Sequence, residues 1–340
     1  MSMRMNKRKR DHLRILSDDP LTDRSKSYFD KIRLKHRALP QIDLEEVDTE
    51  IFFMEKRLSF PLIISSMTGG GGDEFLRINR NLAEAAEKAG VALALGSQRV
   101  MLTDADAEAS FRLRKYAPNI LMFGNLGAVQ LNNGVGVDDC RRIVDVSEVD
   151  ALYLHLNPLQ EAIQPEGNTN FRELDERIAE VVNGLEHPVV VKEVGCGICS
   201  QDALLLMNAG VRYIDVAGSG GTSWSRIESH RSGCCDTGIV FQDWGLPTPE
   251  ALRQLAPLCR NRAELIASGG IRTGIDMVKA MALGASVCGI AGPFMSRAAE
   301  SAEAVVHYIE ELRNQFRVAM FLLGIRSVSE LTASGSENIC

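Results

Sequence analysis

The residues best suited to chemistry form one short run, HLNPLQE, from His155 to Glu161, directly after an apolar stretch. One imidazole, two amides and one carboxylate in seven positions can donate and accept hydrogen bonds and bind a metal ion. A single histidine is more often a structural residue than a catalyst. Because His155 shares one face of an extended chain with Asn157 and precedes Gln160 and Glu161, we interpret the run as a functional site.

A lysine ends another apolar run, Val189–Lys192. An ammonium group at the end of a buried strand is unfavourable unless an anion pairs with it. The N1–C2=O edge of a reduced flavin is one such anion, so Lys192 is a candidate flavin contact. The next residue, Glu193, points to the opposite side of the strand, and we expect it to have a structural role.

Glycine-rich segments follow two further apolar runs. Gly269-Gly270-Ile271-Arg272 follows one of them, and Ala291-Gly292 follows the next. Backbone N–H groups of such glycines, together with a helix N-terminus, commonly bind phosphate. The pair of motifs therefore predicts a bound phosphate. The four-glycine run Gly69–Gly72 is weaker evidence, since glycine runs are often only flexible turns.

These groups need a scaffold that brings the ends of several strands together. Eight short apolar runs recur along the chain, each followed by a segment with helical periodicity: Pro61–Ser66, Val91–Leu95, Ile120–Phe123, Ala151–His155, Pro188–Lys192, Tyr213–Ala217, Glu264–Ala267 and Ser286–Ile290. Continuously apolar strands separated by helices indicate a parallel sheet buried on both faces. Eight of them predict a (β/α)₈ TIM barrel, whose active site lies at the C-terminal ends of the strands. A doubly wound open sheet is the second possibility.

The domain organisation that we expect is an N-terminal extension, residues 1–58, followed by the barrel, residues 59–340. The extension is polar and charged, with one or two helices and a short strand near Ile51–Met54. The segment Thr222–Pro249 is long for a loop inside a compact domain, which is typical of functional lids. A helix over Ala299–Leu323 is expected to close the barrel or pack on a neighbour.

Composition excludes several classes of protein. With 38 basic and 45 acidic residues the net charge is −7, which argues against nucleic acid or an anionic membrane as the main partner. No run approaches the ~18–20 apolar residues of a membrane span, and no apolar segment of a secretory signal follows the basic N-terminus. That basic N-terminus is either a solvated tail or an arm over an anionic ligand.

The eight cysteines do not form a disulfide framework. Cys196 and Cys199 have CxxC spacing, but the adjacent pair Cys234-Cys235 is a poor second half for a zinc site. We expect reduced structural thiols and a cytoplasmic setting.

Taken together, the motifs resemble those of the type 2 isopentenyl diphosphate isomerases, which are FMN-dependent enzymes of isoprenoid biosynthesis. The resemblance spans nearly the whole chain, and HLNPLQE is its most specific part. The other matching segments are Arg8–His12, Ser66–Gly70, Gly96–Arg99, Asn125, Lys192–Gly195, Gly221–Trp224 with Ile227-Glu228, Asp243–Gly245 and Gly269–Arg272. Two positions depart from the family: Cys199 replaces an expected serine, and Gly292 an often expected arginine.

The resemblance implies a role for each matching residue. The flavin contacts would be Met67, Thr68, Gly69, Ser97, Asn125, Lys192 and Thr222, with Gly270, Ile271, Arg272, Ala291 and Gly292 around its phosphate. The substrate contacts would be Arg8, Lys9, Ser97, Gln98, Arg99, His155, Asn157 and Gln160. Glu161 would bind a Mg²⁺ ion on the substrate diphosphate, and the catalytic residues would be Gln160, His155 and Lys192.

The reaction implied by the resemblance moves a double bond between isopentenyl and dimethylallyl diphosphate, with reduced FMN as acid and base. NADPH or another donor would reduce the flavin once and not in every turnover. Gln160 is too weak an acid to protonate an alkene alone, so we assign it positioning or proton relay. The resemblance also implies a cytoplasmic homotetramer or homo-octamer that has no nucleic-acid or membrane partner.

Three alternatives remain at this stage. An FMN-dependent 2-hydroxy-acid oxidoreductase would share the barrel and the phosphate loops, and His230-Arg231 could supply its histidine and arginine. A barrel like that of inosine monophosphate dehydrogenase would need a nucleophilic cysteine after the sixth strand, and Gly218–Trp224 contains none. A non-catalytic flavin- or phosphate-binding protein is the third.

Overall fold

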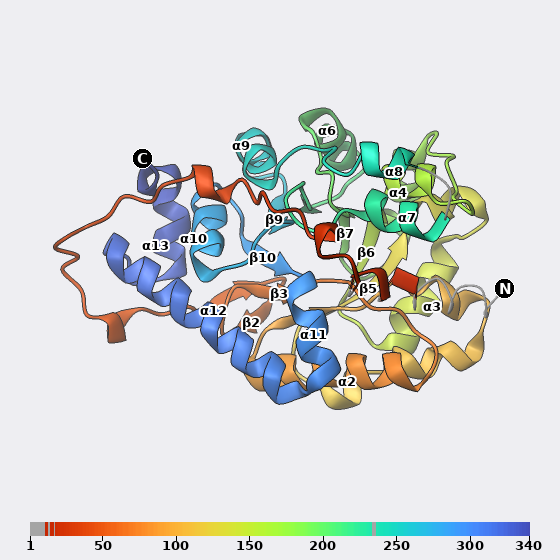
Figure 1. Ribbon diagram of the computed structural model, residues 1–340, viewed down its shortest axis with the longest axis horizontal. Helices are drawn as coiled ribbons and strands as arrows, with labels where there is room; N and C mark the ends of the chain where they lie inside the picture. The colour runs from red at the N-terminus through yellow and green to blue at the C-terminus, as the bar shows by residue number, and fades with distance from the viewer. Residues whose placement is uncertain (1–10, 13, 17, 233–235) are drawn as a thin grey trace.

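The barrel predicted from the sequence is present. In the computed structural model, which describes residues 11–12, 14–16, 18–232 and 236–340, eight parallel strands close in the order β10-β3-β4-β5-β6-β7-β8-β9 (Figure 1). The strands are β3 (Leu62–Ile64), β4 (Ala92–Ala94), β5 (Met122–Gly127), β6 (Ala151–Leu156), β7 (Val189–Glu193), β8 (Tyr213–Asp215), β9 (Glu264–Ser268) and β10 (Val287–Ile290). Each coincides with one of the eight apolar runs, so the prediction of a TIM barrel is confirmed and the open sheet is excluded.

The strands alternate as a barrel requires. In β6, Leu152 and Leu154 join the large core between strands and helices, whereas Tyr153 belongs to the smaller core inside the barrel. In β7, Val191 faces the helices in the same way, and Val190 faces the interior. This alternation places His155, Asn157 and Lys192 on the inner side at the C-terminal end of the barrel.

Helices surround the strands on the outside (Figure 1). They are α2 (Asp73–Ala89), α3 (Val137–Ser147), α4 (Pro158–Ile163), α5 (Leu174–Gly184), α6 (Ser200–Asn208), α7 (Trp224–Ser232), α8 (Thr237–Val240), α9 (Thr248–Cys259), α10 (Gly274–Ala282), α11 (Gly292–Glu300), α12 (Ala302–Leu323) and α13 (Val328–Ser334). Between β4 and β5 the chain forms only short 3₁₀ helices, Arg99–Leu102, Ala105–Ser110 and Arg114–Tyr116. None of the helices in the described ranges is both long enough and apolar enough to cross a membrane.

An antiparallel hairpin, β1 (Ile51–Phe53) and β2 (Lys56–Leu58), closes the N-terminal end of the barrel. Phe53 and Leu58 are buried and belong to the interior core together with Tyr153. The strand expected near Ile51–Met54 is therefore present, but its partner β2 was not predicted. The hairpin also ties the N-terminal extension to the barrel interior.

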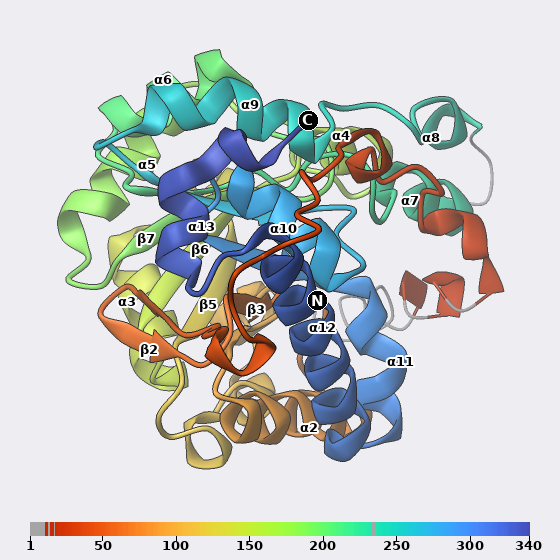
Figure 2. The ribbon, with the colours of Figure 1, turned by 90° about the vertical axis from the view of Figure 1, so that its left-hand side faces the viewer.

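The rest of the extension wraps around the outside of the barrel. Lys35 and Arg37 donate backbone hydrogen bonds to Asn338 and Leu322, at the C-terminal helices. Figures 1 and 2 show this red-to-orange segment running beside the blue helices α12 and α13. Earlier in the chain, Arg24 N–H donates to Gly221 at the other end of the barrel. The extension thus reaches from the mouth to the closed end.

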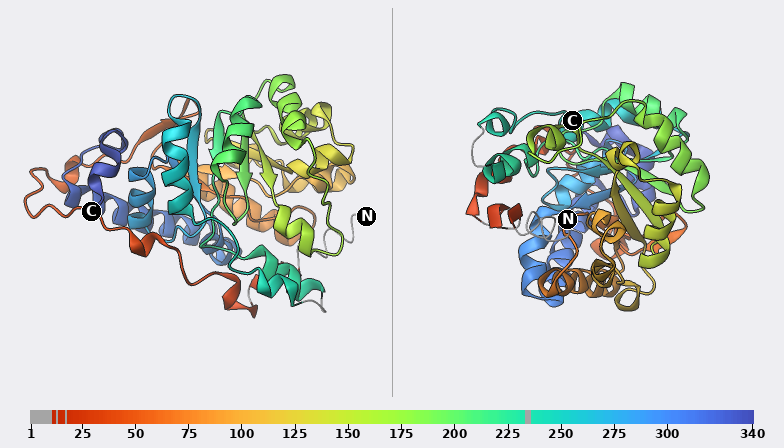
Figure 3. Two further views of the ribbon diagram at one scale, coloured as in Figure 1. Left: turned by 90° about the horizontal axis from the view of Figure 1, so that it is seen from above. Right: turned by 90° about the vertical axis from the view of Figure 1, so that its right-hand side faces the viewer.

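The described part of the long segment between β8 and α9 contains the helices α7 and α8. Figure 3 shows the red N-terminal turns lying beside these turquoise helices. The contact joins His12 to Glu228 and Asp19 to Arg226. The segment predicted as a lid therefore forms one wall of the mouth together with the N-terminal extension.

Candidate functional site

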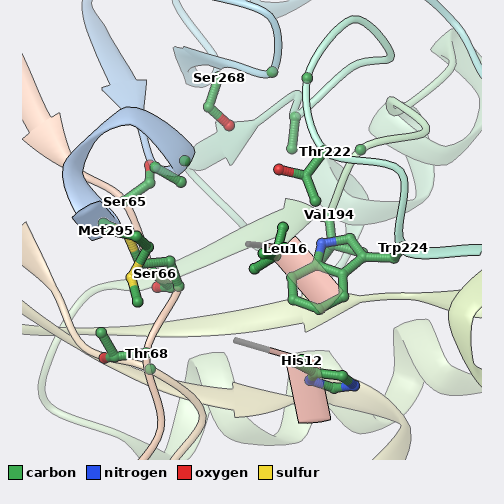
Figure 4. A pocket seen from close by; sticks show the side chains of 18 of the residues that line it. His12, Leu16, Ser65, Ser66, Thr68, Val194, Thr222, Trp224, Ser268 and Met295 are labelled. Atoms are coloured by element: carbon green, nitrogen blue, oxygen red, sulfur yellow. The ribbon is translucent and has the colours of Figure 1, made fainter. Parts of the chain in front are cut away.

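A cavity of about 730 Å³ opens at the C-terminal ends of the strands. Figure 4 shows side chains that reach it from several elements, among them Ser66 and Thr68 after β3, Thr222 and Trp224 after β8, Ser268 from β9 and Met295 from α11. His12 and Leu16 of the extension enter from the side of Trp224. The size is that of a pocket for one or two small organic molecules.

Most of the residues predicted for the site line this cavity: Met67, Thr68, Ser97, Arg99, Asn125, His155, Asn157, Gln160, Glu161, Lys192, Thr222, Gly270, Ile271, Arg272, Ala291 and Gly292. Gly69 and Gln98 are not among its lining residues. Arg8 and Lys9 lie outside the described residues. The structure thus brings together residues that are up to 225 positions apart in the sequence, from Met67 to Gly292.

Gln98 lies behind the wall of the cavity. Its side chain is fully buried, its Oε1 accepts the backbone N–H of Asn125 at 2.8 Å, and its Nε2 donates to Ser147. This side chain holds the backbone of Asn125 within β5, and the contact of Gln98 with substrate stays a prediction. The sequence motif around Ser97 and Arg99 does not reveal that the residue between them faces the other way.

A chain of hydrogen bonds runs across the mouth from β6 to β3. His155 Nδ1 lies 2.7 Å from Asn125 Oδ1, and Asn125 Nδ2 donates to Ser66 Oγ at 2.7 Å. The amide of Asn125 is thus oriented from both sides. Because its N–H group faces Ser66, its oxygen accepts from the Nδ1–H of His155.

Gln160 on α4 and His12 of the N-terminal extension both contact a carboxylate from α7. Gln160 Nε2 donates to Glu228 Oε1 at 2.8 Å, and His12 Nε2 lies 3.0 Å from the same oxygen. Arg231 pairs with the other oxygen of Glu228. Burial alone would raise the pKa of Glu228, but His12, Arg231 and Gln160 outweigh it and lower that pKa to about 2.

Glu228 is thus a site residue to which the sequence analysis gave no role. It was recognised only as part of a matching segment, because its spacing to Gln160 carries no local signal. Gln160 and Glu228 meet because α7, which carries Glu228, forms one wall of the mouth.

Lys192 lies at the bottom of the cavity and is buried. Its Nζ donates to the Glu193 carbonyl at 2.6 Å and lies 3.7 Å from Asp215 Oδ2. Ser268 Oγ donates to the other oxygen of Asp215 at 2.6 Å. Burial raises the pKa of Asp215, and Lys192 and Ser268 oppose the rise. The ammonium group is therefore held in place from below, with cavity on its other side.

Glu193 has the structural role that its position predicts. Its Oε2 accepts the backbone N–H groups of Val194 and Gly195, each at 2.6 Å, and those of Cys196 and Gly197. Burial raises the pKa of Glu193 to about 7, although these N–H groups act in the opposite direction. The carboxyl group thereby sets the turn that follows β7.

The predicted phosphate loops form a tight cradle. A Cβ at Gly269 would lie 2.1 Å from the Gly218 carbonyl oxygen, and one at Gly221 would lie 3.0 Å from the Gly270 nitrogen. Gly269 and Gly270 also have φ angles of +91° and +78°, which side-chain-bearing residues rarely adopt. Opposite them, α11 begins at Gly292 without a side-chain cap. Pro293 has no N–H, and Phe294 N–H donates to the Ala291 carbonyl at 2.9 Å, so the Gly292 N–H is the group at this end that an anion could bind.

Arg272 ties the cradle to the N-terminal extension. Its Nη2 donates to Asp23 Oδ1 at 2.7 Å and to the carbonyls of Arg24 and Gly220 at 2.6 and 2.9 Å. Arg24 in turn donates to the Gly195 carbonyl at 2.8 Å. Much of the guanidinium of Arg272 is thus already engaged, although the residue lines the cavity.

Glu161 is the carboxylate available for a cation. Its Oε1 accepts from Asn157 Nδ2 at 3.0 Å, and its Oε2 accepts the backbone N–H of Asn168 at 2.5 Å. Each oxygen keeps a lone pair. Within the described ranges no group of three or more His, Cys, Asp or Glu side chains could hold a metal ion. A cation here would need most of its ligands from substrate and water, as Mg²⁺ commonly has.

The class of protein follows from a family model. Residues 154–337 match the family of FMN-dependent dehydrogenases. The match covers the strands and loops from β6 to β10 and continues through α13. The chain is thus built as an FMN-dependent barrel, in agreement with the cradle and with Lys192.

Relatives across the full length define the family more closely. The chain is 53% identical over 334 residues to the isopentenyl-diphosphate delta-isomerase of Paracoccus zeaxanthinifaciens, covering 97% of this chain and 96% of the relative. It is 50% identical over 335 residues to the enzyme of the same name from Hydrogenovibrio crunogenus, covering 98% and 97%. The chain therefore belongs to the isopentenyl-diphosphate delta-isomerases of the FMN-dependent type 2.

Solved structures of other FMN enzymes share the fold. The flavin-binding domain of baker's yeast flavocytochrome b2 superposes with a TM-score of 0.67 at 17% identity, covering 93% of this chain and 77% of that one. A mandelate oxidase variant gives 0.64 at 24% identity, with 90% and 86% covered. At this level of identity the likeness concerns the barrel alone.

Proposed function

We propose that this protein interconverts isopentenyl diphosphate and dimethylallyl diphosphate, with reduced FMN as the acid and base and Mg²⁺ on the diphosphate. The names of its relatives support the reaction, and the family model supports the flavin. The cavity must then accommodate two phosphorylated molecules at once.

The observation that carries the proposal is the placement of two polar regions on opposite sides of one cavity. In the closed strand order, β10 and β6 are four strands apart, so they face each other across the barrel. The start of α11 follows β10, the Gly269-Gly270 cradle follows the neighbouring strand β9, and Asn157, Gln160 and Glu161 follow β6. One side suits the phosphate of a flavin and the other suits a metal diphosphate.

The residues present fit FMN. The cradle around Gly269 and Gly270 admits only glycine, and the uncapped start of α11 offers the Gly292 N–H to a phosphate. Lys192 at the bottom of the cavity would bind the N1–C2=O edge of the ring. When bound and reduced, FMN supplies a proton donor and acceptor at N5 and an electron-rich face.

The side chains of the mouth then perform distinct tasks. Lys192, held by Asp215, stabilises negative charge on the cofactor. His155 and Asn157 bind substrate, and Gln160, oriented by Glu228, positions the reacting carbons or relays a proton. Trp224 and Leu16 add apolar surface, which helps to exclude water from a developing carbocation.

Glu161 fits as the protein ligand of Mg²⁺. One buried carboxylate with free lone pairs is sufficient when diphosphate oxygens and water complete the coordination. The cation would neutralise the diphosphate and fix its position along the wall that follows β6.

The oxidoreductase alternative finds less support. His230 Nε2 lies 2.7 Å from Asp19 Oδ2, and Arg231 pairs with Glu228 and Glu166. Neither His230 nor Arg231 lines the cavity. The pair that could have abstracted a proton and bound a carboxylate is therefore used to fasten α7 to its neighbours.

The test is an anaerobic assay of the purified protein with isopentenyl diphosphate, FMN, Mg²⁺ and NADPH. We expect dimethylallyl diphosphate to form only when the flavin is reduced, with far less than one NADPH used per turnover. Absence of product from a protein that still binds FMN would refute the proposal, and steady oxidation of a 2-hydroxy acid would support the alternative. NADPH as reductant, the cytoplasmic setting and the homo-oligomeric state stay predictions.

A further inference from the structure

One buried side chain on the wall of the cavity has no hydrogen-bond partner. Gln164 lines the cavity and is 4% exposed, yet in the described part of the chain nothing bonds to its Oε1 or its Nε2. Neither the motif analysis nor the resemblance gave this residue a role. A buried amide without partners loses its hydration without replacement, which destabilises a protein by roughly 1–3 kcal/mol per polar group.

A second buried glutamine shows that the fold can satisfy such a group. Gln98, which is fully buried, accepts a hydrogen bond from Asn125 N–H and donates one to Ser147. Gln98 lies behind the cavity, and Gln164 lies on it. Since an unpartnered buried polar group in a native protein needs an explanation, a ligand in the cavity is the simplest one for Gln164.

The position of Gln164 indicates which ligand. Asn157, Glu161 and Gln164 are spaced by four and three residues, so they share one side of the turn of chain that contains α4. All three line the cavity, and Asn157 Oδ1 is likewise buried without a partner. Three side chains with oxygen acceptors thus follow one another along the wall after β6.

The backbone holds this arrangement firmly. Gly167 N–H donates to the Gln164 carbonyl at 3.1 Å, and Asn168 N–H donates to Glu161 Oε2. A Cβ at Gly167 would lie 1.8 Å from the Glu161 carbonyl oxygen, so the chain turns back too closely for any side chain there. The turn therefore fixes Gln164 relative to the Glu161 carboxylate.

We propose that Gln164 is a further binding residue for the magnesium diphosphate, next to Glu161. Its Oε1 accepts hydrogen bonds from water on the cation, and its Nε2 donates to a diphosphate oxygen. The inference rests on the proposed function, because it needs a diphosphate at this wall. The flavin phosphate is not expected to satisfy Gln164, since the cradle follows β9, three strands away from β6 in the closed order.

The test compares the wild-type holoenzyme with the Gln164→Leu variant, which keeps the size of the side chain and removes its polarity. Calorimetric titration with inorganic pyrophosphate and Mg²⁺ should give at least about 10-fold weaker binding for the variant, because it loses the hydrogen bond to the diphosphate and the one to water on the cation. FMN affinity should be unchanged. The apo variant should melt at the same temperature as the wild type or higher, because a buried unpartnered amide has been removed.

Gln201→Leu, at an exposed position on α6, is the matched control and should leave pyrophosphate binding unchanged. If Gln164→Leu does not fold, Gln164→Met serves in its place, since methionine adapts to irregular space. Equal pyrophosphate affinity in a folded, active Gln164 variant would overturn this inference and leave the proposed function intact. A wild-type holoenzyme that neither binds magnesium pyrophosphate nor isomerises would overturn both.

Discussion

Glu228 shows how one buried charge organises the chemistry of several neighbours. Because its Oε1 accepts from Gln160 Nε2, the oxygen of that amide must face the other way, where Asn157 Nδ2 lies 3.1 Å from it. The orientation of Gln160 therefore follows from its contacts. Without Glu228 the amide of Gln160 would lose this hydrogen bond and could rotate.

The stability of the protein in acid should report the charge on Glu228. The folded-state pKa of about 2 lies below the ordinary value of 4.5. The stabilisation that the ionised Glu228 carboxylate gives the folded state is therefore complete above pH 4.5, and it is lost as the pH falls toward 2. Urea denaturation measures the unfolding free energy at each pH. Between pH 5 and pH 2 we expect this free energy to fall by about 3 kcal/mol less in Glu228→Gln than in the wild type.

The matched control for this measurement is Glu166→Gln, which removes a more exposed partner of Arg231. Its pH profile should stay close to that of the wild type, because exposed ion pairs contribute little. Parallel profiles for wild type and Glu228→Gln would contradict the charge assigned to Glu228.

At the scale of elements, the β1–β2 hairpin should contribute to stability through one face only. Phe53 is 2% exposed inside the barrel, where its ring lies 5.8 Å from that of Tyr213, whereas Phe52 is 74% exposed. Phe53→Ala should lower the unfolding free energy by about 3–5 kcal/mol, and Phe52→Ala should change it by less than about 0.5 kcal/mol. Urea denaturation measures both, and similar effects would show that the hairpin does not plug the barrel.

The start of α11 should decide the affinity for the flavin phosphate. A carboxylate introduced by Gly292→Asp would occupy the N–H group that we assign to the phosphate, and space exists for it because a Cβ there lies 3.8 Å from Thr222 Oγ1. We expect FMN binding to weaken at least 10-fold, measured by flavin fluorescence. Riboflavin, which has no phosphate, should bind wild type and variant alike.

Gly136→Asp is the control for this charge change, since it adds a carboxylate at the start of α3, where a Cβ meets nothing within 4 Å. Its FMN affinity should equal that of the wild type. An equal loss for riboflavin and FMN in Gly292→Asp would mean that the substitution disturbs the ring site instead of the phosphate site.

The strands could be predicted because their apolar runs are local signals, and the paired loops after β9 and β10 followed from them. Of the hairpin, strand β1 could be predicted and strand β2 could not. Its turn places Met54 and Glu55 at φ angles of +48° and +62°, and the sequence lacks the Asn-Gly or Asp-Gly that usually marks such a turn. In the site, the facing of His155 follows from strand alternation, whereas the partnership of Glu228 with Gln160 depends on tertiary contact.

At the scale of the whole molecule, the N-terminal extension completes the mouth. Asp19 pairs with Arg226 at 2.6 Å and with His230 at 2.7 Å, and His12 reaches Glu228. Ser223 N–H donates to the Thr22 carbonyl at 2.7 Å. These contacts join residues about 200 positions apart, so the described part of the extension is fixed at the mouth by contacts with α7 and the residue before it.

The resemblance assigns Arg8, which lies outside the described residues, to the substrate diphosphate, and this role can be tested. Arg8→Ala should raise KM for isopentenyl diphosphate about 10- to 100-fold, the loss of a charged hydrogen bond, and change kcat far less. The control is Arg14→Ala, whose side chain is 71% exposed and should leave KM unchanged. Equal KM values for Arg8→Ala and Arg14→Ala would contradict this role and favour the alternative that the basic segment is a solvated tail.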